Sequence, residues 1–509
     1  MGSEAGEDTW SVSVKKALRI SLVRATAAGE VKPINTFKPK FAYSIFGDDE
    51  QIFGYQGLTV NLAFNASDMR PNLQVKYQKK FPPAPDVEAT DVEGALQDFL
   101  PEVAFQKKKD FDNAIQRVRK DWTPPGSLVA SFTRGGTTRE VWMGNLGDLA
   151  VKQLLKRIQI FVPLFIEGGT LIPTDDDTDA EDDRWTIFFL YSKAPAPDAS
   201  DQFVYTFNGY STVYRFFHIQ TPTPPASPSN LEDLDFDSDF DLASLPCRTR
   251  ISQFVILPPF QMNGLGLKLY SIIYQHYLNH PQTVEITVED PNEAFDDMRD
   301  VADLIFLRQR DDFNALKLDT SLVLPKGSAK VPNNIIDQAA ADEVRRKTKI
   351  APRQFTRVLE MHLMSKLPEA VRPGISADKQ VARRAPKEDR YQSTLWHILM
   401  KKRIFNQNKD ALGEMDLDER VEKLSETVRS VAWQYESLIV RADNATRKEK
   451  EAQEAEKAKS AAESDDETGK SGSESGKRKA ADEASGETNA KKQKLAERSR
   501  TGMSANVPI

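Results

Sequence analysis

The sequence predicts a mixed α/β fold in which an α+β region precedes a central sheet and a helical region follows it. Residues 251–290 are expected to run strand, helix, strand, an order typical of a mixed α/β sheet. Earlier runs such as Leu58–Phe64 alternate apolar with polar or small residues, whereas residues 334–438 show apolar spacing near 3.6. We therefore expect an N-terminal α+β domain (1–150), a central domain (151–320), a helical region (321–445) and a charged, disordered tail (446–509).

The composition excludes some classes of function. Of the 509 residues, 39% are hydrophobic and 28% are charged, and the formal net charge is −7. Much of the polar excess lies after Thr446, which leaves a body able to bury a sizeable core. An acidic body argues against direct, sequence-independent binding to nucleic acid, which relies on clustered Lys and Arg, and is compatible with a basic substrate.

The sequence also carries signals of compartment. A single cysteine, Cys247, allows no disulfide within the chain, so we expect a reducing compartment. No apolar run approaches the roughly 20 residues needed to span a bilayer, and Met1–Trp10 is acidic and polar, unlike a signal peptide. Lys477–Lys479 and Lys491–Lys494 have bipartite nuclear-localisation spacing, although charge runs are common in such tails. We expect a soluble protein of the cytosol and nucleus.

Several apolar, β-rich runs precede the strand–helix–strand unit. Ile160–Glu167 and Trp185–Tyr191 are expected to be neighbouring strands joined by an acidic loop. Phe203–Phe207 and Thr212–Phe217 are expected to form a second pair around an Asn-Gly turn. Residues 220–246 are rich in Pro, Ser and Asp, which predicts a surface insertion.

A glycine-bearing turn joins the expected strand Ile251–Leu257 to the expected helix Gly264–Tyr277. Glycine at 264 and 266 lets backbone N–H groups approach a ligand, and the amides and dipole of a helix start favour an anion such as a pyrophosphate. The turn is not a Rossmann fingerprint, because the third glycine position holds Leu269, and no Gly-Lys-Ser/Thr follows as in a P-loop. An ordinary β–α turn would show the same glycines.

The next expected strand ends in carboxylates. Thr283–Asp290 alternates with period two, so that Glu285 and Glu289 share one face. Glu289 lies at the C-terminal end of the strand, where ligands usually sit in open α/β sheets. A carboxylate there can hold a cation and then accept a proton, and burial would raise its pKa towards the working pH. A solvated surface residue would fit the same pattern.

These segments resemble a known family. Gln261–Gly266 matches the GNAT acetyltransferase motif Gln/Arg-x-x-Gly-x-Gly/Ala, and the flanking Ser252–Gln261 is similar to the type B histone acetyltransferase catalytic subunits in their fungal-like form. Val288–Phe295 and Phe46–Glu50 resemble the same family, and the resemblance extends with gaps from about Phe37 to Leu367. It implies a GNAT fold and a histone lysine N-acetyltransferase (EC 2.3.1.48).

The resemblance implies where acetyl-CoA binds, and it implies no metal. The strand before the glycine turn would pair its backbone with the pantetheine arm, and the turn would hold the pyrophosphate. Two residues after the next strand would lie near the thioester. The residues so assigned are Phe254, Val255, Ile256, Gln261, Met262, Asn263, Gly264, Leu265, Gly266, Leu267, Asn292 and Phe295.

The resemblance also assigns the acids of the reaction. A lysine ammonium, with a pKa of about 10.4, is no nucleophile until it loses a proton. Glu289 is implied to be the general base, with Glu167 and Asp290 as further acids near the substrate amine, although an Asp after a strand often caps a helix. Direct attack in a ternary complex needs no acyl-enzyme, so Cys247 is taken as incidental.

Histone contacts and partners follow from the same resemblance. The implied contacts are Asp48, Asp49 and Glu50 in an acidic turn, and Tyr214, Arg215 and Phe216 on a strand. A solvated turn and sheet packing are the alternatives for the two groups. The implied substrate is the tail of newly made histone four, and the implied partner is a WD-repeat histone chaperone, with no direct contact to nucleic acid or membrane.

Two other functions stay open on the sequence. One is a GNAT enzyme for small amines or protein N-termini, against which the acidic turn weighs. The other is a non-catalytic histone-binding scaffold, against which Gln261–Gly266 together with Glu289 weighs. His276 and His280 have an i, i+4 spacing, but without a partner cysteine or an HExxH motif we expect no zinc site.

Overall fold

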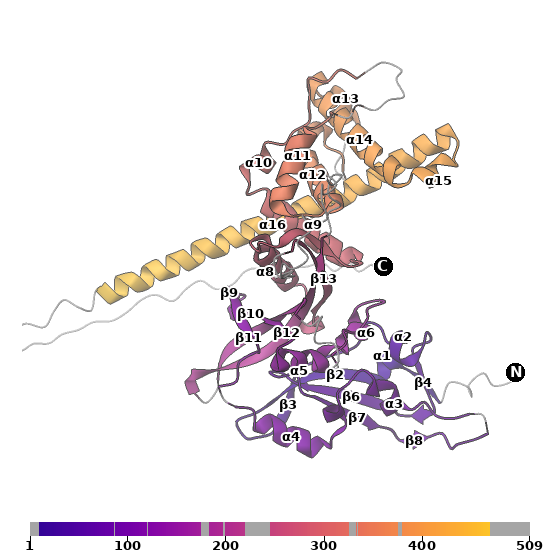
Figure 1. Ribbon diagram of the computed structural model, residues 1–509, viewed down its shortest axis with the longest axis vertical. Helices are drawn as coiled ribbons and strands as arrows, with labels where there is room; N and C mark the ends of the chain where they lie inside the picture. Colours follow the sequence, from indigo (N-terminus) through magenta and orange to yellow (C-terminus); the bar gives the residue numbers. More distant parts are fainter. Residues whose placement is uncertain are drawn as a thin grey trace, which may run out of the picture. The chain divides into compact units, whose positions relative to one another are not determined.

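A six-stranded mixed sheet forms the centre of the fold (Figure 1). Its strands lie in the order β14-β13-β12-β11-β10-β9, and every neighbouring pair is antiparallel except β13 and β14. Helix α8 (Leu265–Leu278) connects this parallel pair, so the predicted strand–helix–strand unit is confirmed. The strands are β9 (Ser127–Arg134), β10 (Thr137–Asn145), β11 (Trp185–Ala196), β12 (Ala199–Phe217), β13 (Cys247–Ile256) and β14 (Thr283–Val288).

The computed structural model describes most of the chain. It covers residues 10–468 with the exception of 86, 120, 175–182, 197–198, 219–244, 325–331, 333 and 375–378. Most of the expected insertion at 220–246, the acidic loop and the tail with the nuclear-localisation spacing therefore lie outside the described residues. The chain divides into two units, Met1–Thr446 and Arg447–Ile509, and the site belongs to the first. Within the described part, no helix is both long and apolar enough to cross a membrane.

Helices cover one face of the sheet and share its core. Leu265, Leu269 and Ile273 of α8 are buried against strand residues such as Val213 and Ile251. Helix α9 (Glu293–Leu307) packs beside α8. The same apolar cluster continues into the C-terminal helices, so the helical region shares the core of the sheet.

The opposite face of the sheet packs on the N-terminal part of the chain. Helices α5 (Leu149–Ile158) and α6 (Phe161–Phe165) contribute to a core that contains both Phe189 of β11 and Phe64 of a second sheet. The six-stranded sheet is thus buried on both faces, and its strands β9 and β10 come from residues before 150. The second sheet consists of β3 (Val31–Phe37), β2 (Leu18–Ala25), β6 (Thr59–Asn65) and β7 (Pro71–Lys76).

Shorter elements complete the two ends of the fold. The N-terminal ones are β1 (Ser11–Ser13), α1 (Val14–Ala17), α2 (Tyr43–Phe46), β4 (Gln51–Phe53), β5 (Tyr55–Gln56), β8 (Lys79–Lys80), α3 (Val92–Gln97), η1 (Glu102–Phe105) and α4 (Lys108–Gln116). The C-terminal ones are α10 (Asp311–Asn314), α11 (Gln338–Thr348), α12 (Pro352–Lys366), η5 (Glu369–Val371), α13 (Lys379–Arg384), α14 (Lys387–Gln407), α15 (Lys409–Gly413) and α16 (Leu417–Thr468).

The strand expected at Ile160–Glu167 is wrong, because this segment contains the short helix α6. Its residues Phe161 to Leu164 are all buried, so the segment is apolar on every side. The sequence therefore shows neither the helical nor the strand periodicity of apolar residues. A short apolar run of this kind does not distinguish a buried strand from a buried helical turn. Trp185–Tyr191 is a strand as expected, but it pairs with β10 and β12.

The second expected strand pair is also wrong, because β12 runs without a turn through the Asn-Gly dipeptide. Gly209 lies opposite Ile256 of β13, and a Cβ at Gly209 would fall 2.9 Å from the Cα of Ile256. Asn208 is the extra residue at an irregularity in the pairing with β11, where its Oδ1 accepts a hydrogen bond from Ser192 at 2.7 Å. Asn-Gly usually signals a hairpin, whereas here the glycine allows two strands to approach closely.

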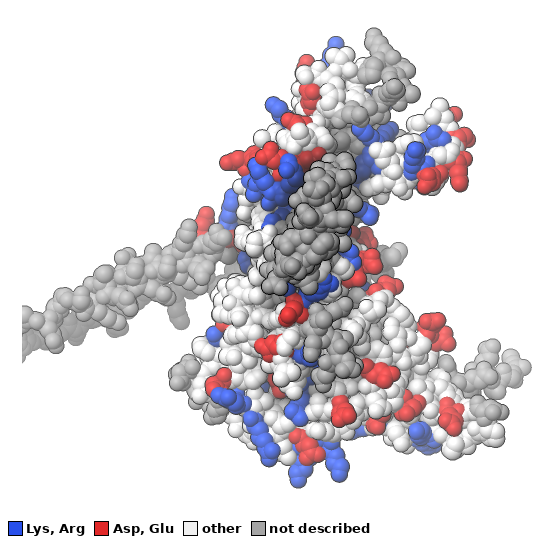
Figure 2. All heavy atoms as spheres, in the orientation of Figure 1, with Lys and Arg blue, Asp and Glu red and all other residues white. Residues whose placement is uncertain are grey.

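Charged side chains of both signs are interspersed on the face shown in Figure 2. On that face, the coloured residues form no broad surface of one sign.

A buried carboxylate joins three helices of the C-terminal region. Glu360 of α12 is 1% exposed and accepts hydrogen bonds from Arg403 Nε of α14 at 2.7 and 2.9 Å and from the Tyr435 hydroxyl of α16 at 2.9 Å. Burial raises the pKa of Glu360, and Arg403 opposes that rise. The charge is therefore stable in the core only with its partners in place.

We expect Glu360→Gln to destabilise the protein by about 3 kcal/mol, because Arg403 would keep its charge in a partly buried position without a carboxylate. Urea unfolding at pH 7 measures this loss. Glu422→Gln, at an exposed position of α16, is the matched control and should change stability little. Equal stability of the two variants would contradict the structural role of the buried pair.

Candidate active site

Strands β13 and β14 part before β13 ends, which leaves a stretch of strand edge unpaired. Parallel pairing ends with Ile251 opposite Val288, where the Glu289 N–H donates to the Ile251 carbonyl at 2.9 Å. β13 continues to Ile256, and its other edge stays paired with β12 to that residue. Apart from the Ile256 carbonyl, which accepts a hydrogen bond from Gln261, the backbone groups of residues 252–256 on the β14 side are therefore open to a ligand that carries amides of its own.

A bulge in β13 lies where the strands part. Between two regular pairings β13 has two residues, Ser252 and Gln253, where β12 has only Thr212. The Ser252 hydroxyl donates to Glu289 Oε2 at 2.6 Å, and Gln253 Nε2 donates to the carbonyl of Thr170 at 2.8 Å. Bulges re-aim side chains and bend strands, and this bulge directs two neighbouring polar side chains to different acidic segments.

The turn after β13 has the geometry of an anion site. It passes through the short helix η4 (Pro258–Phe260), and Gln261 Nε2 donates back to the Ile256 carbonyl at 2.7 Å. Met262 and Gly264 have positive φ angles of 61° and 69°, and the Met262 side chain is fully exposed. No side chain caps α8 at Gly264, and its first turn has no acidic residue. The first amides of the helix are thus available to an anion.

The start of α9 completes one wall of the opening. Asn292 is its N-cap, and Asn292 Oδ1 accepts a hydrogen bond from the Phe295 N–H at 2.9 Å. The Phe295 ring meets the Phe254 ring edge-on, with centroids 5.1 Å apart. A Cβ on Gly266 would lie 3.0 Å from Met298 Sδ, so this glycine allows the two helices to approach closely. The structure therefore places residues of two separate segments, the β13–α8 turn and the start of α9, around one opening.

The three acids expected to be catalytic lie in loops: Glu289 and Asp290 directly follow β14 at the opening, and Glu167 follows α6, which contacts β13. Glu289 is exposed in the chain alone, and its Oε2 accepts the hydrogen bond from Ser252. Asp290 has a φ of 32° and does not cap α9, since Asn292 does. Glu167 is exposed after α6, and the next residue donates its N–H to the Tyr43 hydroxyl at 2.7 Å. Strained backbone at Asp290 is typical of functional turns.

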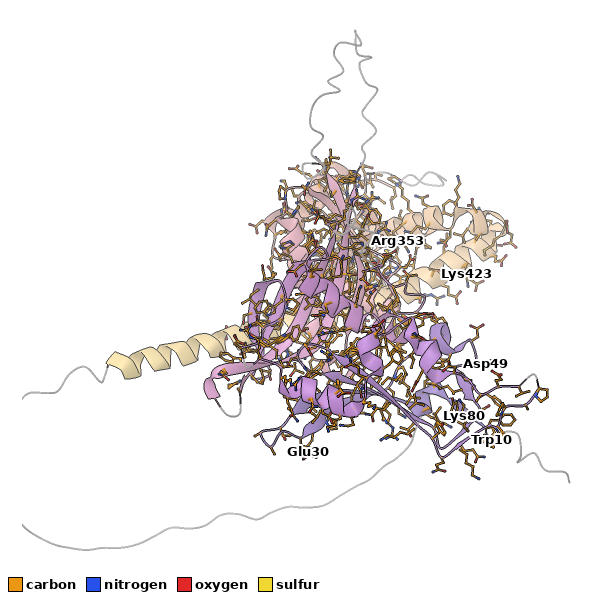
Figure 3. The ribbon with its side chains drawn as sticks, turned by 60° about the horizontal axis from the view of Figure 1, so that its bottom comes forward. Trp10, Glu30, Asp49, Lys80, Arg353 and Lys423 are labelled. Atoms are coloured by element: carbon orange, nitrogen blue, oxygen red, sulfur yellow. The ribbon has the colours of Figure 1, made fainter. Side chains whose placement is uncertain are left out.

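The acidic turn near Phe46 divides into one structural and two exposed carboxylates. Glu50 accepts a hydrogen bond from the Ala42 N–H at 2.7 Å and pairs with Lys15 at 2.6 Å, and this Lys15 hydrogen bond lowers the pKa of Glu50. Asp48 and Asp49 are exposed, without an ion-pair partner within the described part of the chain, and Asp49 projects from the surface in Figure 3. Only these two are free to meet a basic ligand.

The second group of expected histone contacts is engaged in sheet packing. Tyr214 is buried, accepts a hydrogen bond from Arg184 at 3.0 Å and packs on Trp185 with ring centroids 4.7 Å apart. Arg215 on the other face donates to the Asp183 carbonyl at 2.6 Å. Phe216 is half-exposed beneath the Arg250 guanidinium, which lies 4.5 Å from its ring centroid.

Two polar residues of the site are not marked as functional in the sequence. Ser252 and Gln253 owe their positions to the bulge, and their partners lie 37 and 83 residues away in the chain. Nothing in a single sequence pairs residues at such separations. Within the described residues, no group of three or more His, Cys, Asp or Glu side chains is arranged to hold a metal ion.

A parallel strand pair that opens at a bulge, followed by a glycine turn at a helix start, defines a GNAT-like acetyltransferase fold. Comparison with known proteins agrees with this class. The family model described as Histone acetyl transferase HAT1 N-terminus matches residues 10–167. The model described as Fungal HAT1, C-terminal matches residues 310–368.

Three similar relatives, from Neurospora crassa, Gibberella zeae and Pyricularia oryzae, carry the name Histone acetyltransferase type B catalytic subunit. The first is 50% identical over 458 residues, which cover 86% of this chain and 89% of the relative. The second is 48% identical, with 87% and 94% covered, and the third 46%, with 87% and 93% covered. The chain belongs to the family of type B histone acetyltransferase catalytic subunits, and it is therefore an acetyltransferase.

Proposed function

We propose that this enzyme transfers acetyl from acetyl-CoA to a lysine side chain in the N-terminal tail of newly made histone four, with Glu289 as the general base. The observation that carries the proposal is the position of Glu289. It follows the last paired residue of β14, at the vertex where the strands part, and Ser252 holds one of its carboxylate oxygens. The other oxygen, Oε1, has no partner within the described residues.

The open edge and the glycine turn fit the acetyl donor. The pantetheine arm has two amide groups, which suit the backbone groups of Phe254 to Ile256 that neither β12 nor Gln261 occupies. The uncapped first turn of α8 suits the pyrophosphate. Phe254 and Phe295 offer apolar contacts beside the arm. When bound there, acetyl-CoA supplies an activated thioester to the vertex.

The residues at the vertex have the chemistry that lysine acetylation needs. The Glu289 carboxylate attracts the lysine ammonium and then accepts its proton, directly or through water. The hydrogen bond from Ser252 restricts the orientation of that carboxylate, so less conformational entropy is lost when the carboxylate meets the substrate amine. Because Glu289 is exposed in the chain alone, the bound coenzyme and peptide must themselves cover it and exclude water. Direct attack leaves no role for Cys247, which is buried.

We expect Glu289→Gln to lower kcat by about 100-fold while leaving the Kd of acetyl-CoA unchanged, because the amide keeps the shape but cannot accept the proton. Steady-state rates on a histone-four tail peptide and calorimetric titration with acetyl-CoA measure the two quantities. Glu293→Gln, an exposed acid at the start of α9, is the control. A large loss of coenzyme affinity in Glu289→Gln would show that the residue supports the fold instead.

The acidic turn offers a second contact for a basic tail. The Tyr43 hydroxyl of α2 meets the loop after Glu167, and the same loop reaches β13 through Thr170 and Gln253. This chain of hydrogen bonds ties the turn with Asp48 and Asp49 to the strand that carries the bulge. Exposed carboxylates attract a flexible, lysine-rich peptide over several ångströms and in a salt-dependent way.

We expect the double variant Asp48→Asn with Asp49→Asn to raise the KM for the histone-four peptide about fivefold at low salt, with kcat unchanged. The increase should shrink as salt is added, and KM for a small polyamine should stay the same. The double variant Asp98→Asn with Glu102→Gln removes two exposed acids elsewhere in the N-terminal part as the control. Identical KM values for both double variants would argue against histone binding at the acidic turn.

The remaining assignments rest on the family resemblance and belong to the same proposal. They include a WD-repeat histone chaperone as partner and a location in both cytoplasm and nucleus. In the proposed division of labour, residues 1–150 contribute to peptide binding, residues 151–320 provide most of the acetyl-CoA site and residues 321–445 have a supporting helical role. Tyr214, Arg215 and Phe216 and the carboxylates of Glu167 and Asp290 are proposed to line the path of the peptide.

A further inference from the structure

The β9–β10 hairpin brings an arginine to the start of helix α8. Arg134 is the last residue of β9, and its guanidinium lies against the backbone of Gly264. A Cβ built on Gly264 would fall 2.7 Å from Arg134 Cζ and 3.2 Å from Nη1. Glycine at this position therefore serves two purposes, since it permits the positive φ and leaves room for the arginine.

The hairpin tip is held in shape by a second arginine. Arg139 Nη1 donates to the carbonyl oxygens of Arg134 and Thr137 at 2.7 and 3.2 Å. Burial, and to a smaller extent the charge of Arg134, lower the pKa of Arg139. Arg134 itself is exposed and is thus presented at the helix start by a braced backbone.

In the chain alone this is an unfavourable place for a cation. The start of α8 is the positive end of a helix dipole, and its first turn has no acidic residue. Lys268 lies one turn further, 5.8 Å from the ring of Phe132 on β9. Within the described part of the chain, no carboxylate pairs with Arg134. An anion placed at the helix start would relieve this concentration of positive charge.

We propose that Arg134 is a phosphate-binding residue of the acetyl-CoA site, reaching the pyrophosphate from the strand edge opposite to β14. The inference rests on the proposed function, because it assumes that acetyl-CoA occupies the glycine turn. A guanidinium has planar, paired donors that match phosphate oxygens, and it complements the backbone amides of α8, which approach from the helix side. The hairpin thus acts as one half of a clamp whose other half is the turn at Gly264.

Calorimetric titration of the full chain with coenzyme A tests this role. We expect Arg134→Gln to weaken binding about tenfold or more, which is the usual loss for one hydrogen bond to a charged group. Arg134→Lys should recover part of the affinity, because it keeps the charge without the fork. Arg19→Gln, at an exposed position of β2, is the matched control and should bind as the parent does.

Shortened ligands identify the phosphate. The loss in Arg134→Gln should persist with 3′-dephospho-coenzyme A and vanish with pantetheine, which has no phosphate. A loss that disappears with 3′-dephospho-coenzyme A would assign Arg134 to the 3′-phosphate and overturn the pyrophosphate assignment. Thermal unfolding without ligand should show no lower stability for Arg134→Gln, whereas an arginine needed by the fold would cost stability there.

The failure of this inference can be told from the failure of the proposed function. If the parent chain and Arg19→Gln bind coenzyme A and Arg134→Gln binds within twofold of them, Arg134 has no role in phosphate binding. If the parent chain does not bind coenzyme A at all, the proposed acetyl-CoA site at the glycine turn is wrong, and the clamp is wrong with it.

Discussion

The parting of β13 from β14 is the constraint on which the rest of the site depends. One extra residue in the bulge at Ser252 and Gln253 bends β13, and Pro291 has no N–H with which the other chain segment could continue the ladder. The result is a strand edge in the sheet that β14 leaves unpaired over 252–256. An open edge in a buried sheet is costly unless a ligand completes it, which is why we propose that the coenzyme binds there.

The surrounding fold holds this opening rigid. Both faces of the sheet are buried, one against the N-terminal sheet and one against α8, α9 and the C-terminal helices. Among the helices that cover the sheet, the Tyr270 hydroxyl of α8 donates to Asp303 of α9 at 2.8 Å, and Gln354 of α12 donates to both Asp303 and Asp300. Burial raises the pKa of Asp300 to about 6, and Arg357, 2.5 Å from its carboxylate, opposes the rise. These polar links fix α8 and α9 to α12, which explains how helices far along the chain support the site.

The sequence predicts the regular parts of this structure well. The apolar face of α8, the strands at both ends of it and the helical character beyond residue 334 follow from periodicity, because each pattern has a local physical cause. The failures occur where the cause is not local. The short helix α6 is buried on all sides. Gly209 is needed because a neighbouring strand lies close to it, and it does not form a turn.

The same division applies to the site. The residues of the glycine turn predict an anion site, and the family resemblance assigns roles to Glu289 and Asn292. Arg134 contacts Gly264, 130 positions further along the chain, and the bulge brings Ser252 to Glu289. No local sequence pattern predicts either contact. Glu50 looks like its neighbours in the sequence, and only its hydrogen bond to Ala42 and its pairing with Lys15 separate it from Asp48 and Asp49.

Hydrogen–deuterium exchange with and without coenzyme A tests the central claim most directly. If the open edge of β13 and the start of α8 hold the coenzyme, amide protection should rise in residues 252–268 and stay unchanged in the N-terminal sheet. Protection that appears elsewhere, with residues 252–268 exchanging at the same rate in both states, would contradict the account.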